Sequence, residues 1–259
     1  MIRHMVLNSI RLYNVKFGEK YGEMIIACDD KNYWRKNIFP YYKAHRKADR
    51  EKSPLDWNNI FSILNKIRDE LKETFPWKVI QIDTAEADDI IATLCNRFGK
   101  TLKAEDDIDI LIISGDKDFA QLQKYANVEQ YSPVTKKWIR ISNPESFLRE
   151  HIMRGDRGDG VPNFLSADNV IVTGARQKPL ASKKIEKWIG LDPRDFCNEV
   201  MLRNYKRNES LVNLDLIPSA IINQRNEKYD NYKIPPRSGL LNYFIKNRLK
   251  LLMDKIGEF

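Results

Sequence analysis

The sequence predicts an α/β fold, with a parallel-sheet core followed by a mostly helical C-terminal region. In the first half of the chain, short apolar runs alternate with amphipathic helical patterns. Strand signals nearly vanish after about residue 145. Acidic clusters follow the apolar runs or adjoin turns. We expect a core over residues 1–144, which includes a basic segment at 31–54, and a helical region over residues 145–259.

The N-terminal half reads as helix, strand, helix and strand. The apolar spacing in residues 2–16 predicts a helix, and the run at 24–28 predicts a buried strand that ends at Asp29. Asp56 is a suitable N-cap for the helix that follows, and Pro76 lies just beyond its last apolar residue. Residues 79–82 predict a second strand.

The same alternation continues to residue 141. Residues 86–98 predict a helix closed by Gly99, and residues 108–113 predict a third strand. Residues 127–131 and 137–141 predict a hairpin around a Ser-Pro-Val-Thr turn. Beyond it the chain reads as helical, and Pro235-Pro236 precede a last amphipathic helix.

The composition favours a polyanionic partner. Lys and Arg number 44 against 36 Asp and Glu, a net charge of +8. Such a surface attracts nucleic acid, although a merely soluble basic protein has the same balance. The three cysteines are scattered and only three histidines are present, which predicts neither a disulfide framework nor a Cys/His zinc site. No run approaches the ~20 apolar residues of a membrane span, so we expect a cytoplasmic protein without membrane contact.

Eight carboxylates lie where the predicted strands and turns end. In a parallel sheet the carboxyl ends of the strands share one edge, so these groups are distant in sequence but are expected to converge. Mg²⁺ prefers oxygen ligands and needs only one or two protein carboxylates per ion, so the set suffices for two Mg²⁺ ions, for which Mn²⁺ is an expected substitute. Two such ions hydrolyse a phosphodiester in line. The eight are Asp29, Glu86, Asp88, Asp89, Asp116, Asp118, Asp156 and Asp159.

Each acidic cluster also has a plainer explanation. The acids at 86–89 favour a helix N-terminus through its dipole. Asp116 and Asp118 suit a turn or an N-cap, and residues 155–160 are rich in turn residues. It is the joint occurrence of the clusters after successive strands that favours a metal site.

Residues 33–50 alternate cations with aromatic rings directly after the Asp29 strand. Cations neutralise phosphates, and rings stack on unpaired bases. The segment is therefore expected to guide single-stranded nucleic acid across the metal site. The alternative is a surface helix with solvated charges and a few core aromatics.

Four motifs occur in an order that resembles a known family. They are Tyr-Lys-Ala-His-Arg at 42–46, Glu-Ala-Asp-Asp-Ile-Ile-Ala at 86–92, Ser-Gly-Asp-Lys-Asp-Phe-Ala-Gln-Leu at 114–122 and Gly-Asp-Arg-Gly-Asp at 155–159. The set resembles the flap endonuclease and 5′-3′ exonuclease superfamily, which includes the 5′ nuclease domain of bacterial DNA polymerase I. Within it, the chain is most similar to the ribonuclease H group of T-even-type phages, nearly end to end.

The resemblance implies a PIN-like 5′ nuclease core, a helical arch and a helical region that grips duplex DNA. It implies Mg²⁺-dependent removal of RNA primers and 5′ flaps during phage DNA replication, beside a single-stranded DNA-binding protein. All eight carboxylates are implied as metal ligands, direct or through water. Lys43 and Arg46 are implied as catalytic arch cations at the scissile phosphate, and Arg35 and Tyr42 as further nucleic-acid contacts.

The chain departs from the family pattern in two places. The family's first strand, which ends in a metal-binding Asp, has no counterpart before Asp29. A start that lies upstream, a missing piece on a separate chain and an impaired form would each explain this, and we expect a separate N-terminal fragment to complete the site. The usual Gly-rich helix-hairpin-helix is not clear at 161–174, and Lys183, Lys184 and Lys187 are expected to grip duplex DNA instead. A scaffold that binds DNA without cutting it, or an interaction subunit that recruits a replication protein, stays open as an alternative.

Overall fold

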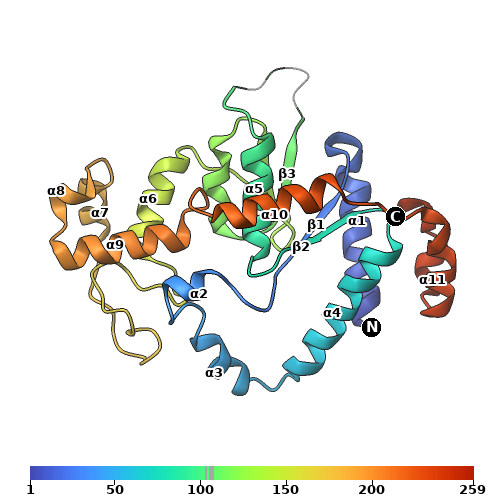
Figure 1. Cartoon of the computed structure of the whole chain (residues 1–259), viewed down its shortest axis with the longest axis horizontal. Coiled ribbons are helices and arrows are strands. Elements are labelled where there is room, and N and C mark those ends of the chain that lie inside the picture. Colours follow the sequence, from blue (N-terminus) through green and yellow to red (C-terminus); the bar gives the residue numbers. More distant parts are fainter. Residues whose placement is uncertain (103, 105–107) are drawn as a thin grey trace.

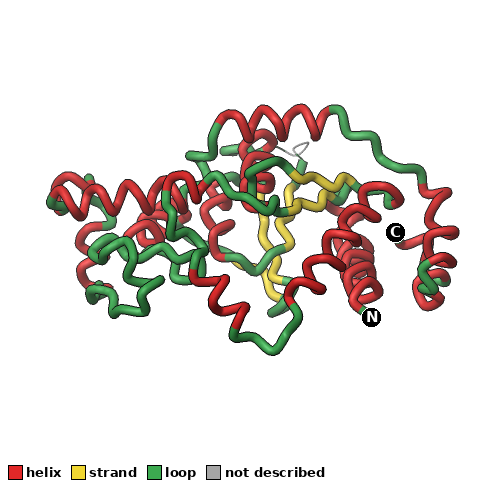
Figure 2. The backbone as a smooth tube through the Cα atoms, turned by 60° about the horizontal axis from the view of Figure 1, so that its bottom comes forward, coloured by secondary structure: helices red, strands yellow, loops and turns green. Residues whose placement is uncertain are grey.

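The computed structural model describes residues 1–102, 104 and 108–259. Helices dominate, and short strands lie in the middle of the molecule (Figures 1 and 2). The main elements are α1 (Ile2–Tyr21), β1 (Ile25–Cys28), α2 (Arg35–Ile38), α3 (His45–Glu51), α4 (Trp57–Thr74), β2 (Lys78–Gln81), α5 (Ala87–Phe98), β3 (Ile110–Ile113), the 3₁₀ helix η1 (Lys117–Lys124), β4 (Val128–Ser132), β5 (Lys137–Ile139), α6 (Pro144–Arg154), α7 (Ser182–Trp188), α8 (Pro193–Phe196), α9 (Glu199–Val212), α10 (Ser219–Asp230), α11 (Leu240–Lys246) and α12 (Lys250–Met253).

The strands of the described residues form two small sheets. β1 pairs with β2 in parallel, with Ile26 opposite Val79. β3 pairs with β4 in parallel, and β4 pairs with β5 as the expected antiparallel hairpin. The expected strand at 24–28 is confirmed, but its expected burial is wrong, because all four residues of β1 are only half-buried. In a parallel sheet the strands are normally covered on both faces, so the described chain covers β1 less completely than a central strand of such a sheet.

Local signals account for the helix boundaries. The Asp56 side chain accepts a hydrogen bond from the backbone N–H of Asn59 at 3.1 Å and so caps α4, as expected. Helix α1 is longer than expected and reaches Tyr21 before Gly22 ends it with a positive φ. Helix α5 ends at Gly99 as expected, although Gly99 itself is extended rather than left-handed.

Two apolar cores hold the α/β part together. One joins β2, α5 and η1 and includes the buried Ile80, Ile90 and Phe119. The other joins α1, α4 and the C-terminal helices, with Phe75 and Phe259 at its centre. Both cores contain residues from beyond position 145, including Leu214 and Ile217 in the first. The C-terminal region therefore completes the α/β core, and the boundary at 144/145 stays an expectation.

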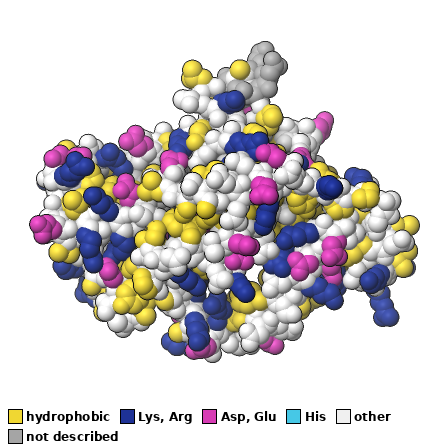
Figure 3. All heavy atoms as spheres, viewed as in Figure 1, with side chains coloured by type: hydrophobic (Ala, Val, Ile, Leu, Met, Phe, Trp, Pro, Cys, Tyr) yellow, Lys and Arg dark blue, Asp and Glu magenta, His cyan; other side chains and the backbone are white. Residues whose placement is uncertain are grey.

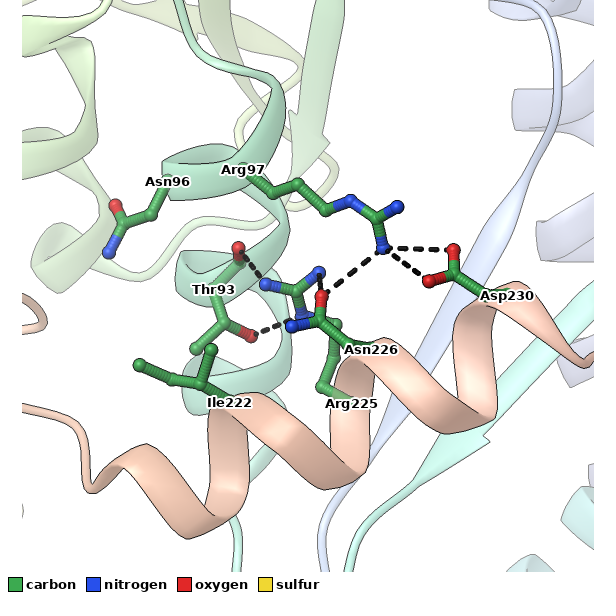
Figure 4. A pocket seen from close by; sticks show the side chains of 7 residues that line it. All are labelled: Thr93, Asn96, Arg97, Ile222, Arg225, Asn226 and Asp230. Atoms are coloured by element: carbon green, nitrogen blue, oxygen red, sulfur yellow. Dashed lines mark hydrogen bonds and ion pairs between the residues drawn. The ribbon is translucent and has the colours of Figure 1, made fainter.

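Helix α10 is attached to α5 by polar contacts around a pocket of about 530 Å³ (Figure 4). The buried Arg225 donates to the Thr93 carbonyl at 2.7 Å, and Arg97 pairs with Asp230 at 2.9 Å. The pocket lies at the C-terminal half of α5, whereas the acidic residues of this helix lie at its first turn. Since its polar groups bond to one another, we interpret it as the joint between the two helices.

The segment that links β1 to α4 runs away from the sheets and carries α2 and α3 (Figure 1). It corresponds to the basic segment at 31–54, which we call the arch segment. Its base packs on α9 through a small apolar cluster that includes Phe39, Tyr42 and Leu211. The arch segment is thus attached to the helical region at one end and to α4 at the other.

None of the helices in residues 1–102, 104 and 108–259 combines the length and apolar character that a membrane crossing requires.

Candidate active site

The strand ends bring the first acids together. Asp29 follows β1, and its Oδ1 accepts a hydrogen bond from the backbone N–H of Ala87 at 2.7 Å. Ala87 is the first residue of α5, so Asp29 lies beside the helix turn that carries Glu86 and Asp88. The free N–H groups of a helix N-terminus attract a carboxylate, which explains this contact.

Arg35 forms a buried ion pair with the first turn of α5. Its guanidinium donates to Asp89 Oδ1 at 2.7 Å, to Glu86 Oε2 at 2.9 Å and to the Leu211 carbonyl at 2.8 Å. The Trp34 indole N–H also donates to Asp89, at 3.0 Å. Arg35 is 2% exposed and Asp89 is fully buried. Both oxygens of Asp89 are therefore occupied by donors of the protein.

This geometry bears on three expectations. The Arg35 guanidinium is buried against α5, where it is not exposed to nucleic acid. Asp89 is not open to a metal ion, because Arg35, Trp34 and the backbone N–H of Glu86 occupy its oxygens. Tyr42 is 3% exposed, so its ring is not free to stack on a base.

The Tyr42 hydroxyl instead lies 2.9 Å from both Glu86 Oε2 and Asp159 Oδ2. Burial, followed by the negative charge of Asp159, raises the pKa of Tyr42 above its ordinary range, so the phenol stays protonated as a donor. Tyr42 thereby connects the acid of α5 with the acid of the loop at 155–160.

Lys43 and Arg46 face the same two acids. The Lys43 ammonium donates to Glu86 Oε1 and lies 3.5 Å from Asp159 Oδ1. Arg46 donates to Asp159 Oδ1 at 2.7 Å and to the Gly158 carbonyl at 3.1 Å. Burial alone raises the pKa of Glu86, but attraction by Lys43 and Arg35 outweighs it and holds the pKa below its ordinary value. Both arch cations thus lie beside the acids, and their contact with a scissile phosphate stays a prediction.

A glycine permits this close approach. Gly160 has a φ of +75°, and a Cβ built on it would lie 2.9 Å from the Tyr41 carbonyl and 3.1 Å from His45 Nδ1. The backbone N–H of Lys43 donates to the Asp159 carbonyl at 2.7 Å beside it. A side chain at position 160 would therefore push the loop away from the arch segment.

A second group of acids surrounds a histidine. Asp118 follows Asp116, whose side chain caps η1 by accepting from the Asp118 N–H at 3.0 Å. His151 Nε2, near the end of α6, lies 3.0 Å from Asp118 Oδ1 and 3.6 Å from Asp156 Oδ2. Lys117 pairs with Asp156 at 2.9 Å. Neither His151 nor Lys117 was predicted from the sequence. The feature that could have identified His151 is its position one helical turn before Gly155 and Asp156.

Asp88 interacts electrostatically with acids of both groups, and their negative charges disfavour its ionised form. Burial, followed by the negative charges of Asp116 and Glu86, raises the pKa of Asp88 to about 8. A carboxyl group with this pKa is mostly protonated at neutral pH unless a cation relieves the repulsion.

The donor set fits divalent metal ions. Asp89 and Glu86 are both buried and accept from protein donors on both oxygens. The negative charges of Asp116, Glu86 and Asp118 raise the pKa of Asp88, so the acids lie close enough to repel one another. Four protein cations, Arg35, Lys43, Arg46 and Lys117, already contact the acids other than Asp89. Asp118 Oδ1 and His151 Nε2 are buried without a hydrogen-bond partner among the described residues, which leaves both atoms available to an ion. The expected convergence of acids from successive strand ends is thus present.

The three lysines expected to contact duplex DNA lie on α7. Lys183, Lys184 and Lys187 are exposed, while Ile185 between them is buried. Figure 3 shows further Lys and Arg side chains over the same end of the molecule and along its lower edge. The geometry is compatible with phosphate contacts.

Comparison with known proteins defines the class. The family model for the 5′-3′ exonuclease, N-terminal resolvase-like domain matches residues 4–151, and the model for the T4 RNase H C-terminal region matches residues 143–259. The chain therefore belongs to the 5′-3′ exonuclease family, a family of metal-dependent nucleases.

Two relatives show which members of this family the chain resembles. It is 37% identical to the ribonuclease H of Enterobacteria phage T4, over 100% of this chain and 87% of that protein. It is 32% identical to the flap endonuclease Xni of Shewanella sp. (strain MR-4), over 54% of this chain and 51% of that protein. The chain thus spans most of the phage relative but matches about half of the flap endonuclease.

Solved structures agree on the fold. The T5 D15 protein co-crystallised with metal ions superposes with a TM-score of 0.62, over 85% of this chain and 90% of that chain, at 15% identity. A T5 D15 flap endonuclease complex with DNA and metal ions superposes with a TM-score of 0.59 at 16% identity. The expected nuclease fold with a helical C-terminal region is confirmed.

Replacing Arg35 by Met is expected to lower the free energy of unfolding by about 3–5 kcal/mol, because it leaves the charges of Asp89 and Glu86 buried without their partner. Urea unfolding measures the change. The matched control is Lys36→Met, next in the chain but exposed, which is expected to cost less than about 1 kcal/mol. Equal losses in the two variants would contradict a structural role for Arg35.

Asp88→Asn is expected to stabilise the metal-free protein, and more so as pH rises. The folded-state pKa of Asp88 is raised to about 8, above that of an unfolded chain, so stability is lost as pH increases between about 4 and 8. In EDTA, the variant should melt roughly 4 °C or more above the parent at pH 8, with a smaller gap at pH 5.5. The exposed Asp83→Asn is the control. A gap that is constant with pH would contradict the assignment.

Proposed function

We propose that the protein is a Mg²⁺-dependent 5′ nuclease that removes RNA primers and 5′ flaps during phage DNA replication. The single observation that carries the proposal is the convergence of acids from four separate segments beneath two cations of the arch segment. Relatives named as ribonuclease H and flap endonuclease support the substrate class. The T5 D15 complex with DNA and metal ions supports both the nucleic acid and the metal.

The acids would hold two Mg²⁺ ions, with Mn²⁺ as a substitute. Glu86 and Asp159 contact the Lys43 ammonium, Asp29 lies at the first turn of α5 beside Asp88, and Asp116, Asp118 and Asp156 lie around η1 and α6. Bound there, the ions supply a water of lowered pKa and neutralise charge at the phosphate. Asp89 does not take part directly, and it instead holds the first turn of α5 in place through Arg35.

Lys43 and Arg46 would act on the scissile phosphate. Donors placed where charge develops in the transition state lower its energy. Arg46 has 42% of its side chain exposed, so it is accessible to a strand passing under the arch segment. Lys43 is less exposed and must exchange its contact with Glu86 for one with the phosphate.

Duplex DNA would lie against α7. Its lysines are solvated and point away from the buried Ile185, which suits contacts with phosphates that carry no sequence information. We further propose that the protein works in the cytoplasm of the host cell, beside a phage single-stranded DNA-binding protein.

We also propose that a separate N-terminal fragment adds a β-strand next to β1 and β3. The described strands form two sheets that do not pair with each other, and Figure 2 shows both in the middle of the molecule. β1 and three of the four residues of β3 are only half-buried. Unpaired edges of apolar strands are templates for another strand. A strand ending in Asp would add a carboxylate beside Asp29.

Asp116→Asn is expected to reduce Mg²⁺-dependent cleavage of a 5′-flap substrate at least ~100-fold while leaving DNA binding measurable, because it removes a carboxylate at the proposed metal site.

Lys43→Ala is expected to lower turnover ~100-fold with the carboxylates intact. For both variants, a gel assay measures cleavage and a fluorescence titration measures DNA binding, so a loss of catalysis is distinguished from a loss of binding.

The matched controls are Asp254→Asn and Lys246→Ala, which change exposed residues outside the arch segment and should cut like the parent protein. Full cleavage by Asp116→Asn or Lys43→Ala would contradict the assigned roles. Binding without cleavage by the parent protein would favour a DNA-binding scaffold.

A synthetic peptide with the family's first strand and its terminal Asp is expected to raise cleavage at least ~10-fold by completing the sheet and the metal site. The same peptide with Asn in place of Asp should raise the melting temperature without restoring cleavage. If neither peptide changes melting or cleavage, the added strand is excluded.

A further inference from the structure

His151 presents a buried nitrogen to the acids around η1. It lies near the C-terminal end of α6 and is 5% exposed. Its ring stacks on Phe147, one turn earlier in the helix, with centroids 6.0 Å apart and planes 18° apart. This stacking restrains the plane of the imidazole ring.

Nε2 has close neighbours but no hydrogen bond. It lies 3.0 Å from Asp118 Oδ1 and 3.6 Å from Asp156 Oδ2. Neither contact has hydrogen-bond geometry, so Nε2 and Asp118 Oδ1 are both buried without a partner among the described residues. Buried polar atoms are seldom left in this state, because each one costs about 1–3 kcal/mol. A shared ligand between the two atoms would remove this cost.

The three donor atoms are close enough to bind one metal ion, and the 3.0 Å separation of His151 Nε2 and Asp118 Oδ1 matches that of neighbouring ligands. With metal–ligand distances of about 2.1 Å, neighbouring ligands of an octahedral ion lie ~3.0 Å apart and those of a tetrahedral ion ~3.4 Å apart. The three donor atoms of Asp118, His151 and Asp156 lie within 4.8 Å of one another. We propose that they form a mixed nitrogen–oxygen site that binds Mn²⁺ more tightly than Mg²⁺. This rests on the proposed nuclease function, because the two aspartates belong to its acid cluster.

The preference follows from the donor types. Mg²⁺ selects oxygen ligands and retains its waters, whereas imidazole nitrogen binds later divalent metals more strongly. Lys117 pairs with Asp156 at 2.9 Å, but 55% of its side chain is exposed, so it is free to turn into solvent when an ion binds.

Pulsed EPR on the full chain loaded with Mn²⁺, without DNA, tests the nitrogen contact directly. The parent protein should show modulation from one imidazole ¹⁴N, and ¹⁵N-histidine labelling should convert it to the ¹⁵N pattern. His151→Gln should abolish the modulation and weaken Mn²⁺ binding at least ~10-fold, with Mg²⁺ binding changed less. His4→Gln is the matched control and should retain the signal.

The absence of nitrogen modulation in the parent protein, or its persistence in His151→Gln, would overturn the proposal. The labelled parent decides the question even if the variant fails to fold. The outcome is separable from that of the nuclease function. Cleavage with Mg²⁺ but no nitrogen coupling rejects only the His151 site, and nitrogen coupling without any cleavage rejects only the nuclease assignment.

Discussion

The rest of the site depends on one buried ion pair, between Arg35 and the first turn of α5. The guanidinium joins the arch segment to Asp89 and Glu86 and also donates to the Leu211 carbonyl of α9. Burial of a charged group has a desolvation cost, which a close ion pair with additional hydrogen bonds offsets. Three parts of the chain that are distant in sequence thereby acquire fixed positions, and the remaining acids are aligned relative to them.

This arrangement divides the carboxylates by role. Asp89 has both oxygens occupied and serves the fold. The others face one another, and Lys43, Arg46 and Lys117 offset part of their charge. Asp88 has no ion pair of this kind among the described residues, and its raised pKa records the remaining repulsion. The cations of the protein therefore do not neutralise all the negative charge of the site. This remaining negative charge favours the binding of a metal ion.

The order of the elements and the positions of most acids were predictable from the sequence, because strand ends and helix starts follow from local patterns. The convergence of Asp29, Glu86 and Asp116 needs only a parallel arrangement of short apolar runs. The roles of individual side chains were not predictable in this way. Arg35 and Lys36 look alike in a basic segment, yet one is buried and the other exposed, because contact with α5 and α9 decides it. His151 was overlooked because its neighbours Asp118 and Asp156 come from different elements.

The position of Lys43 couples the arch segment to the charge state of the acids. Its ammonium group contacts Glu86 and Asp159, so these contacts must be given up before it reaches a phosphate. A divalent ion that neutralises the same carboxylates weakens their hold on the lysine and leaves it a net attraction for the phosphate. Because Lys43 also has a left-handed backbone, with a φ of 54°, the conformation that holds it against the acids is a strained one. Under the proposed function, metal binding and the release of Lys43 toward a phosphate would therefore be two consequences of the same change in charge.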